Sequence, residues 1–353
     1  MKVLIVGDWH SDLHEEELLK SFIRLGYQAS SFKWFEYLQV PTSGKNLPKG
    51  IFNRFQSKFL TGPAISAINR DLRRKAFQES PDIIFVYRGS HILPRTLSAI
   101  KSSLPTCRMI GYNNDDPFSP RQPRHYWRHF VASIPIYDLV LAYRLNNLCD
   151  YSRAGAQSVD LLRSWYVPDR NYPLSLSLQD NISYQSDVVF VGHYENDGRL
   201  EYLEEVVRKG FRLRIFGPPE TWVKPLKRSA ILQKLHPVRK VWGKDYNKAL
   251  SAAKVALCFL SKLNRDTYTR RCFEIPATKT VLFSEFTEDL AAMYLEGSEA
   301  VFFRGLEDFS RKLISLLDDN QRIVSIAEAG YQRAVTSGYD IDSRISKLFK
   351  AAV

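Results

Sequence analysis

The sequence predicts an α/β protein with two doubly wound domains, each built on a parallel sheet. Apolar segments of strand length alternate with amphipathic helical segments, as they do where helices cover both faces of a sheet. The alternation restarts in the second half, and 353 residues suffice for two domains with separate cores. A hydrophobic content of 44% and a charged content of 25% are ordinary for a globular protein and argue against disorder.

The first half opens with an apolar strand at residues 2–6, which ends at Gly7-Asp8 and is too short for a signal peptide. Further along, the alternation predicts strands at 29–32, 83–87, 108–112 and 139–142 and helices at 15–25, 64–80, 94–101 and 148–154.

Residues 169–186 show no clear hydrophobic period, and we interpret them as an interdomain linker. The second half then predicts strands at 187–191, 212–216, 255–259 and 281–283, helices at 199–209, 244–253, 309–317 and 320–337, and an amphipathic tail at 341–352.

The net charge of +12 is compatible with nucleic acid, an anionic membrane or phosphorylated ligands. Residues 45–75 contain eight basic residues and a single acidic residue, Asp71, and Phe52, Phe55 and Phe59 are interleaved with the basic residues. Basic residues beside exposed aromatic rings suit the surface of an anionic membrane. Alternatively, the three phenylalanines, which recur at helical spacing, face the core and the charges are merely solvated.

Four cysteines lie scattered in apolar contexts without pair spacing, at positions 107, 149, 258 and 272. This pattern favours buried thiols in a reducing compartment over disulfides or zinc. No apolar run approaches the roughly 20 residues that span a bilayer. We therefore expect a cytoplasmic protein, either free or peripheral on the inner face of the cell membrane.

Residues 264–285 carry the most specific signal, because charged side chains crowd a short helical segment that runs into the apolar strand 281–283. Asp266 and Glu274 are eight positions apart, which puts them about two turns apart on one helical face if the helix is continuous. A carboxylate near the end of a parallel strand suits a ribose diol, and the flanking Arg270 and Arg271 suit phosphates.

This segment resembles the C-terminal signature of GT-B glycosyltransferases, in particular the spore-maturation (CgeB-like) group with the pattern Arg-x-Phe-Glu-x-Pro-Ala. The matching residues are Arg271, Phe273, Glu274, Pro276 and Ala277. The resemblance implies the GT-B fold, two Rossmann-like domains facing each other across a cleft. It assigns residues 1–170, with a helix at 338–353 crossing back, to an acceptor domain and residues 187–337 to a nucleotide-sugar donor domain.

In the wider retaining group that this segment resembles, two acidic residues at this spacing hold the donor. The resemblance thus implies that Asp266 contacts the hydroxyl groups of the donor sugar and that Glu274 grips the ribose. Asp266 replaces the usual Glu, and Lys279 replaces the usual Gly. Since a non-glycine residue in a left-handed turn costs about 1 kcal/mol, either the turn differs or Lys279 faces the ligand.

Four further positions of the second half are implied in donor binding. Gly192 ends a strand and Arg199 opens the next helix, as in the Phe-Val-Gly and Arg pattern of the family, and such loops present backbone N–H groups to an anion. Gly217 and Trp242 correspond to loops that pocket the base in GT-B enzymes, where Trp242 either stacks on the base or simply packs within the protein. Of the adjacent Arg270 and Arg271 only one can face the ligand, and the family pattern favours Arg271, unless it pairs with Asp266.

The first half offers candidates for acceptor binding and proton transfer. Asp8, His10, Asp12 and His14 follow the first strand and can orient the acceptor or act as a base, or serve as helix caps. Candidates after later strands are Arg88 and the pair Asp115-Asp116, which can instead form Asx turns before Pro117. The adjacent pair is not the spaced pair of metal-dependent enzymes, so we expect no metal.

The resemblance implies a retaining, metal-independent glycosyltransferase that moves a sugar from a nucleotide-diphosphate-sugar to a glycan, lipid-linked or protein acceptor. The donor is a co-substrate, and no cofactor is expected. If the reaction inverts instead, Asp8, His10 or Asp116 must be the base. The alternatives are a non-catalytic nucleotide-sugar-binding or assembly protein on the same fold, and an RNA-binding protein, although no nucleic-acid module is recognisable.

Overall fold

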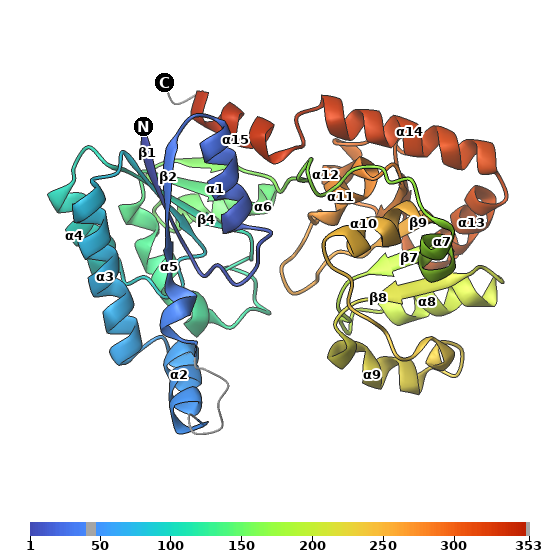
Figure 1. Cartoon of the computed structure of the whole chain (residues 1–353), viewed down its shortest axis with the longest axis horizontal. Coiled ribbons are helices and arrows are strands. Elements are labelled where there is room, and N and C mark those ends of the chain that lie inside the picture. Colours follow the sequence, from blue (N-terminus) through green and yellow to red (C-terminus); the bar gives the residue numbers. More distant parts are fainter. Residues whose placement is uncertain (40–46, 351–353) are drawn as a thin grey trace. The chain divides into compact units, whose positions relative to one another are not determined.

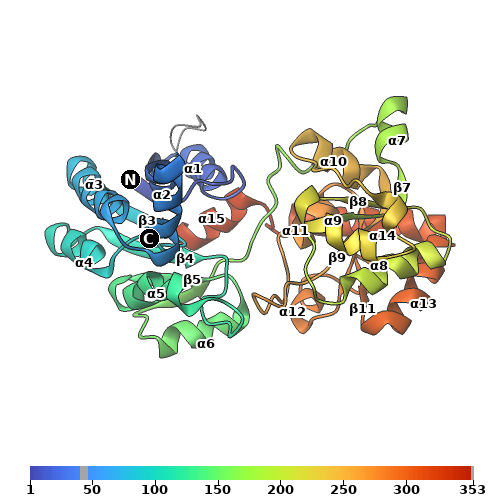
Figure 2. The ribbon, with the colours of Figure 1, turned by 90° about the horizontal axis from the view of Figure 1, so that it is seen from below.

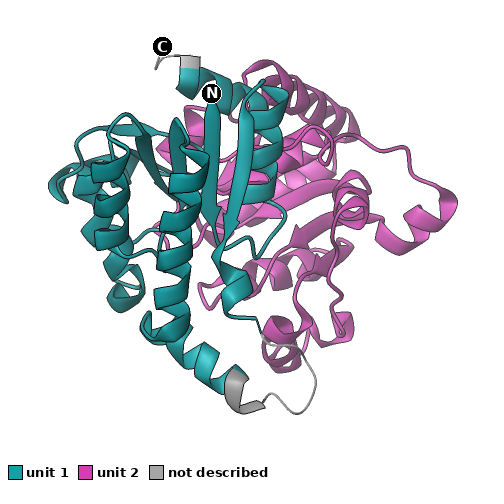
Figure 3. Cartoon of the chain, turned by 60° about the vertical axis from the view of Figure 1, so that its left-hand side comes forward, with its two compact units in different colours: residues 1–163, 341–353 teal, residues 164–340 magenta. Residues whose placement is uncertain are grey.

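A computed structural model describes residues 1–39 and 47–350 of the chain. The chain forms two compact units, and each is an α/β domain with its own core (Figure 3). Unit 1 comprises Met1–Arg163 and Ile341–Val353, and unit 2 comprises Ser164–Asp340. None of the described helices is long and apolar enough to cross a bilayer.

Unit 1 contains a parallel sheet with strand order β2-β1-β3-β4-β5-β6. Its strands are β1 (Lys2–Gly7), β2 (Gln28–Lys33), β3 (Ile83–Tyr87), β4 (Arg108–Asn113), β5 (Leu139–Ala142) and β6 (Val159–Leu161). Its helices are α1 (Glu15–Arg24), α2 (Leu47–Phe59), α3 (Pro63–Glu79), α4 (Pro94–Ser103), α5 (Arg124–Ser133), α6 (Leu145–Arg153) and α15 (Ile341–Lys350), with short 3₁₀ turns η1 (Trp34–Tyr37) and η3 (Ile134–Ile136).

The last helix, α15, lies beside α1 of the same unit (Figure 1). The Arg24 guanidinium donates two hydrogen bonds of 2.7 Å to the Asp342 carboxylate. The ring of Phe349 stands edge-on to that of Phe22, with centroids 5.2 Å apart. A polar clamp at one end and an aromatic contact at the other hold the tail on unit 1.

Unit 2 contains a second parallel sheet with strand order β11-β10-β9-β7-β8 and helices on both of its sides (Figure 2). Its strands are β7 (Ser186–Val191), β8 (Leu213–Phe216), β9 (Ala253–Cys258), β10 (Val281–Glu285) and β11 (Val301–Phe303). Its helices are α7 (Leu178–Tyr184), α8 (Arg199–Arg208), α9 (Pro219–Arg228), α10 (Lys244–Ser251), α11 (Arg271–Ala277), α12 (Glu288–Ala291), α13 (Gly305–Leu317) and α14 (Asn320–Thr336), with the 3₁₀ turn η4 (Gln233–Leu235).

Each sheet has a switch point where the strand order reverses, between β1 and β3 in unit 1 and between β7 and β9 in unit 2. Loops that leave the carboxyl ends of the two strands at such a point run to opposite faces of the sheet. They leave a crevice there, which is where open α/β sheets bind ligands. The predicted fold of two doubly wound domains is confirmed, and the switch points show where to look for sites.

Two expectations about local structure were wrong. The segment 169–186 belongs to unit 2, and its end forms α7, which Ser177 and Asp180 start with a capping box. The helix expected to join Asp266 to Glu274 begins only at Arg271. Because Arg265 adopts a left-handed conformation (φ 48°), the chain turns just before Asp266, and the two carboxylates do not share a helical face.

The turn at Lys279 is left-handed (φ 60°) although the residue is not glycine, and the Lys279 ammonium pairs with Glu328 of α14. The ion pair therefore directs this side chain to a neighbouring helix. Three of the four cysteines are buried as expected, but Cys149 is exposed, because it lies on the outer face of α6.

We predict that Gly111→Ala destabilises unit 1 by about 1–3 kcal/mol, because a Cβ at this position of β4 would lie 2.7 Å from the buried ring of Tyr137. Gly50→Ala in α2 is the matched control, since nothing lies within 4 Å of its Cβ, and alanine favours a helix by roughly 0.5–1 kcal/mol. Urea unfolding measures both variants. Equal stability of the two variants would contradict the packing described for β4.

Candidate functional site

The strongest sequence candidate, Glu274, is buried in the first turn of α11 with both carboxylate oxygens engaged. Its Oε2 accepts a 2.6 Å hydrogen bond from the Tyr246 hydroxyl of α10, and its Oε1 lies 3.0 Å from Nε of Arg270. Burial, followed by the charge of Glu274, raises the pKa of Tyr246 well above its usual value, so this phenol stays a hydrogen-bond donor. Sequence reasoning missed Tyr246, since a tyrosine on a helix carries no signal of its partner.

Arg271 is the neighbouring side chain, and its guanidinium lies against Gly192 at the end of β7. A Cβ at position 192 would come within 2.9 Å of Nη2 of Arg271, so glycine leaves the space that the guanidinium uses. Among the described residues, Arg271 has no hydrogen-bond or ion-pair partner, whereas Arg270 is paired with Glu274. Arg271 is therefore a half-buried cation that is free to bind an anion.

Gly192 and Gly217 meet where β7 and β8 end. A Cβ on Gly217 would lie 2.0 Å from the carbonyl oxygen of Gly192, which is closer than any side chain permits. The same carbonyl accepts a 2.9 Å hydrogen bond from Nε1 of Trp222, and the N–H of Gly192 donates to the carbonyl of Phe216. These contacts fix the position of the Gly192 backbone, against which the Arg271 guanidinium lies.

Arg199 lies at the start of α8 but is buried, and its guanidinium is fully engaged. Two of its nitrogens bind the Asp197 carboxylate at 2.8 and 2.6 Å, and a third donates to the carbonyl of His193 at 2.7 Å. In this arrangement Arg199 closes the loop that follows β7. Its expected contact with a phosphate stays a prediction.

Glu195 joins that loop to the one after β9, because it accepts from His193 Nε2 at 2.9 Å and from the Ser261 hydroxyl at 3.0 Å. Burial favours the neutral acid, but the His193 hydrogen bond, the charge of Arg199 and the Ser261 hydroxyl together lower the pKa of Glu195 to about 2. The bridge spans the switch point of unit 2 and rests on an ionised carboxylate. Sequence reasoning missed this role, because no motif marks Glu195 as the partner of a distant loop.

The two remaining donor candidates lie in loops. Asp266 is half-buried, and its N–H donates to the carbonyl of Ser261 at 3.0 Å, which ties it to the loop after β9. Trp242 is 47% exposed, with Nζ of Lys240 5.1 Å from its ring centroid, while its neighbour Val241 is buried. An exposed indole anchored by a buried neighbour is available to stack on a planar ligand.

In unit 1, three of the candidates meet at the switch point. Arg88, which follows β3, binds Asp8 Oδ2 at 3.2 Å and Asp115 Oδ2 at 2.6 Å. Its guanidinium also covers the ring of Trp127, 5.4 Å from the centroid. Arg88 adopts a left-handed conformation (φ 65°), and such strain clusters at functional sites. The structure thus unites Asp8, Arg88 and Asp115 in one half-buried cluster.

Glu15, which sequence reasoning missed, lies beneath this cluster and is completely buried. Its Oε1 accepts from the N–H groups of Asp8 and Trp9 at 3.0 and 3.3 Å, and a Cβ on Gly7 would lie 2.4 Å from the same atom. Burial, followed by the nearby charge of Asp8, raises the pKa of Glu15 to about 8. A carboxyl group that is neutral at pH 7 therefore holds the Asp8-Trp9 turn.

The other candidates of unit 1 have different side-chain surroundings, although the N–H of His10 donates to Oδ1 of Asp8 at 3.0 Å. His10 is exposed against the edge of Phe35, and His14 is half-buried with its ring 5.5 Å from that of Tyr87. Asp116 is fully buried, and its Oδ1 accepts from the N–H of Phe118 and from Asn147. The Asx-turn alternative describes Asp116, which is not accessible to a substrate in this structure.

Residues 199–350 match a family model described as "Glycosyl transferase-like". No curated protein matches the chain significantly. Among solved structures, the chain is similar to sucrose-phosphate synthase from Thermosynechococcus elongatus, with a TM-score of 0.70, 10% sequence identity, and coverage of 100% of this chain and 99% of the other.

HepE of Anabaena, solved in a complex with UDP, matches with a TM-score of 0.66 and 12% identity over 100% of this chain and 99% of that one. A glycosyltransferase from Rickettsia africae gives the same score and identity over 99% and 97%. These similarities over the full chain show the fold, which is GT-B: two parallel-sheet, Rossmann-like domains.

We predict that the free energy of unfolding of the wild type falls relative to that of Glu15→Gln from about pH 5 to about pH 8, whereas other titrating groups such as His91 affect both proteins alike. The unfolded chain releases the Glu15 proton near pH 4.5, the ordinary pKa of a glutamate side chain, whereas the folded chain keeps it until about pH 8. Rising pH therefore favours unfolding. The expected difference is on the order of a few kcal/mol.

Denaturant unfolding across this pH range measures the effect, with Glu16→Gln as the control at the neighbouring, half-exposed position of α1. Parallel curves for the wild type and Glu15→Gln would show that Glu15 is ionised in the folded protein.

Proposed function

We propose that this chain is a glycosyltransferase that transfers a sugar from a nucleotide-diphosphate-sugar to an acceptor. The observation that carries the proposal is the half-buried guanidinium of Arg271, which lies against Gly192, senses the charge of Glu274 and has no hydrogen-bond or ion-pair partner among the described residues. The free cation suits a phosphate group, and the oriented carboxylate beside it suits hydroxyl groups. The pair therefore suits a ligand that carries both. The family model that matches residues 199–350 and the UDP complex of HepE support the same conclusion.

In this proposal, unit 2 binds the donor. Arg271 neutralises the departing diphosphate, Glu274 accepts hydrogen bonds from the ribose hydroxyls, and Trp242 stacks on the base. The Tyr246 hydroxyl and Arg270 hold the Glu274 carboxylate in one orientation before the ligand arrives. Asp266 contacts the sugar from the loop after β9. The charge of the diphosphate is met by side chains of the chain itself, so we propose a reaction that needs no metal.

The cluster of unit 1 is proposed to bind the acceptor. Carboxylates such as Asp8 and Asp115 accept hydrogen bonds from sugar hydroxyls, and Arg88 holds both in place. We propose retention of configuration, in which the leaving diphosphate takes the proton of the acceptor. Should the reaction invert, Asp8 is the better candidate for the base, because Asp116 is buried and the His10 ring packs against Phe35.

A second function, binding of a nucleotide-sugar without transfer, is favoured by one observation. Asp266, which stands where the retaining group has glutamate, lies on a turn and not on α11. A shorter side chain on a loop reaches less far toward the sugar. Release of free nucleotide and sugar from the donor separates the two functions, since a binding protein leaves the donor intact.

We predict that one of UDP, GDP, dTDP, ADP and CMP raises the melting temperature of the wild type but not of Glu274→Ala. A nucleotide at a hundredfold excess over its Kd stabilises the protein by about 2.7 kcal/mol, and thermal unfolding detects this. No shift with any nucleotide would leave the donor site without support.

We further predict that Arg271→Gln weakens binding of the diphosphate of that nucleoside about 10- to 100-fold. This is the loss expected for a charged hydrogen bond of about 1.5–3 kcal/mol. The same change affects the free nucleoside little, because that ligand lacks phosphate. Isothermal titration measures both, with the exposed Arg311→Gln of α13 as the control. Equal losses for nucleoside and diphosphate would place Arg271 away from the phosphates.

A further inference from the structure

Between residues 51 and 59, helix α2 exposes its large apolar side chains to solvent and buries two polar ones against the protein. Asn53 and Gln56 are 7% and 3% exposed. The exposed side chains are Ile51 at 64%, Phe52 at 50%, Phe55 at 53% and Phe59 at 42%. The alternative in which these phenylalanines face the core is therefore wrong. The helix is amphipathic, but its apolar face points to solvent while polar side chains face the protein.

Polar contacts hold α2 in this orientation. Gln56 donates to Oδ1 of Asn53 at 3.1 Å and accepts from the N–H of Ala64 at 2.7 Å. The Ser57 hydroxyl lies 3.1 Å from Nε2 of His91, which follows β3. Since the inner face is satisfied by hydrogen bonds, the outer apolar face is left for a partner.

The charges around this face indicate the nature of the partner. The exposed Arg54 and Lys58 are interleaved with the phenylalanines, Nζ of Lys58 lies 5.6 Å from the centroid of the Phe59 ring, and α2 contains no acidic residue. The cores of protein–protein interfaces are depleted in charge and especially in lysine. Cations interleaved with apolar side chains on one helix face are typical of helices that lie at the surface of an anionic membrane.

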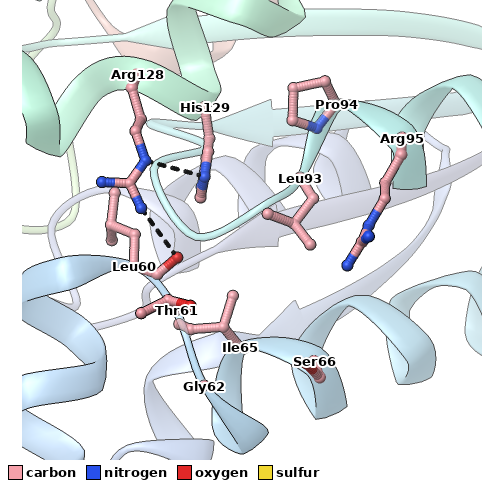
Figure 4. Close-up of a pocket in the computed structure, with 10 residues that line it drawn as sticks. All are labelled: Leu60, Thr61, Gly62, Ile65, Ser66, Leu93, Pro94, Arg95, Arg128 and His129. Carbon is pink, nitrogen blue, oxygen red and sulfur yellow. Dashed lines mark hydrogen bonds between the residues drawn. The ribbon is translucent and has the colours of Figure 1, made fainter.

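A cavity of about 420 Å³ opens at the C-terminal end of α2 (Figure 4). Figure 4 shows Arg128 and His129 of α5 on one wall, Arg95 of α4 on another, and Thr61 and Ser66 below them. Arg128 donates to the carbonyls of Phe59 and Leu60, which ties this wall to α2.

Two arginines and two hydroxyl groups suit a phosphate group. Within the described part of the chain, Arg95 is exposed and makes no hydrogen bond or ion pair. No acidic side chain lines the cavity, so nothing in its wall competes with an anion.

We propose that α2 and this cavity form a docking site for an anionic lipid surface. The phenylalanines enter the region between headgroups and acyl chains, Arg54 and Lys58 meet the headgroup charge, and the cavity takes the phosphate of one lipid headgroup. The docking site does not depend on sugar transfer. Because Ser57 contacts His91, which follows Arg88 of the acceptor cluster in the same loop, docking places a lipid-linked acceptor near that cluster, and this last step rests on the proposed function.

The test is flotation of the full chain with vesicles of phosphatidylcholine, with and without phosphatidylglycerol. The wild type floats with the anionic vesicles and stays at the bottom with phosphatidylcholine alone. The double variant Phe52→Gln, Phe55→Gln loses at least tenfold in binding. Ile23→Gln with Leu145→Gln, which removes two exposed apolar side chains elsewhere on unit 1, binds as the wild type does.

Arg95→Gln tests the cavity and weakens binding to anionic vesicles about fivefold, the effect of about one surface cation, whereas Arg153→Gln on α6 has no effect. Two results together would contradict a headgroup in the cavity: inorganic phosphate stabilises the wild type, and Arg95→Gln floats as the wild type does. The cavity would then bind a soluble anion. Docking on a membrane is overturned if the wild type does not float. It is overturned equally if Phe52→Gln, Phe55→Gln floats normally, or if these substitutions abolish a dimer that sedimentation detects.

Discussion

The candidate site of unit 2 depends on one close approach, the contact of Gly217 with the carbonyl of Gly192. No side chain fits between these residues, so the ends of β7 and β8 meet backbone to backbone. The absence of a Cβ at Gly192 then leaves the space that the Arg271 guanidinium occupies. Two glycines at the ends of adjacent strands thus decide where the cation lies, and Glu274 takes its position from the same short helix that begins at Arg271.

Three arginines lie near this point, and only their surroundings distinguish them. Arg199 is paired with Asp197 and Arg270 with Glu274, so the charge of each is met within the protein. Arg271 lacks such a partner among the described residues, and a cation removed from water gains most from an anion that arrives with a ligand. Composition cannot make this distinction, because it counts charges without pairing them.

Most of the fold could be predicted because strands buried on both faces are continuous apolar runs, such as Ile83–Tyr87 and Val281–Glu285, which the expected strands matched closely. The break before α11 could not, since it depends on a left-handed Arg265 that no propensity favours. Of the candidate site, Asp8, Arg88 and Asp115 could be selected from the sequence because each follows a strand, and these strands are adjacent in the sheet. Glu15 and Tyr246 were missed because their roles come from burial beside a partner distant in sequence.

Hydrophobic periodicity gives the spacing of an apolar face but not the direction in which it points, and α2 shows the consequence. Its phenylalanines recur at the spacing of a core helix, yet Asn53 and Gln56 are the buried residues. Burial lowers the pKa of His91 to about 4, so the imidazole that meets Ser57 is neutral at pH 7 and stacks on Trp34 without a charge. The hydrogen bonds that hold α2 against the rest of unit 1 are therefore made by neutral groups and do not change near pH 7. Its orientation does not require the apolar face, which stays available for a partner without loosening the helix.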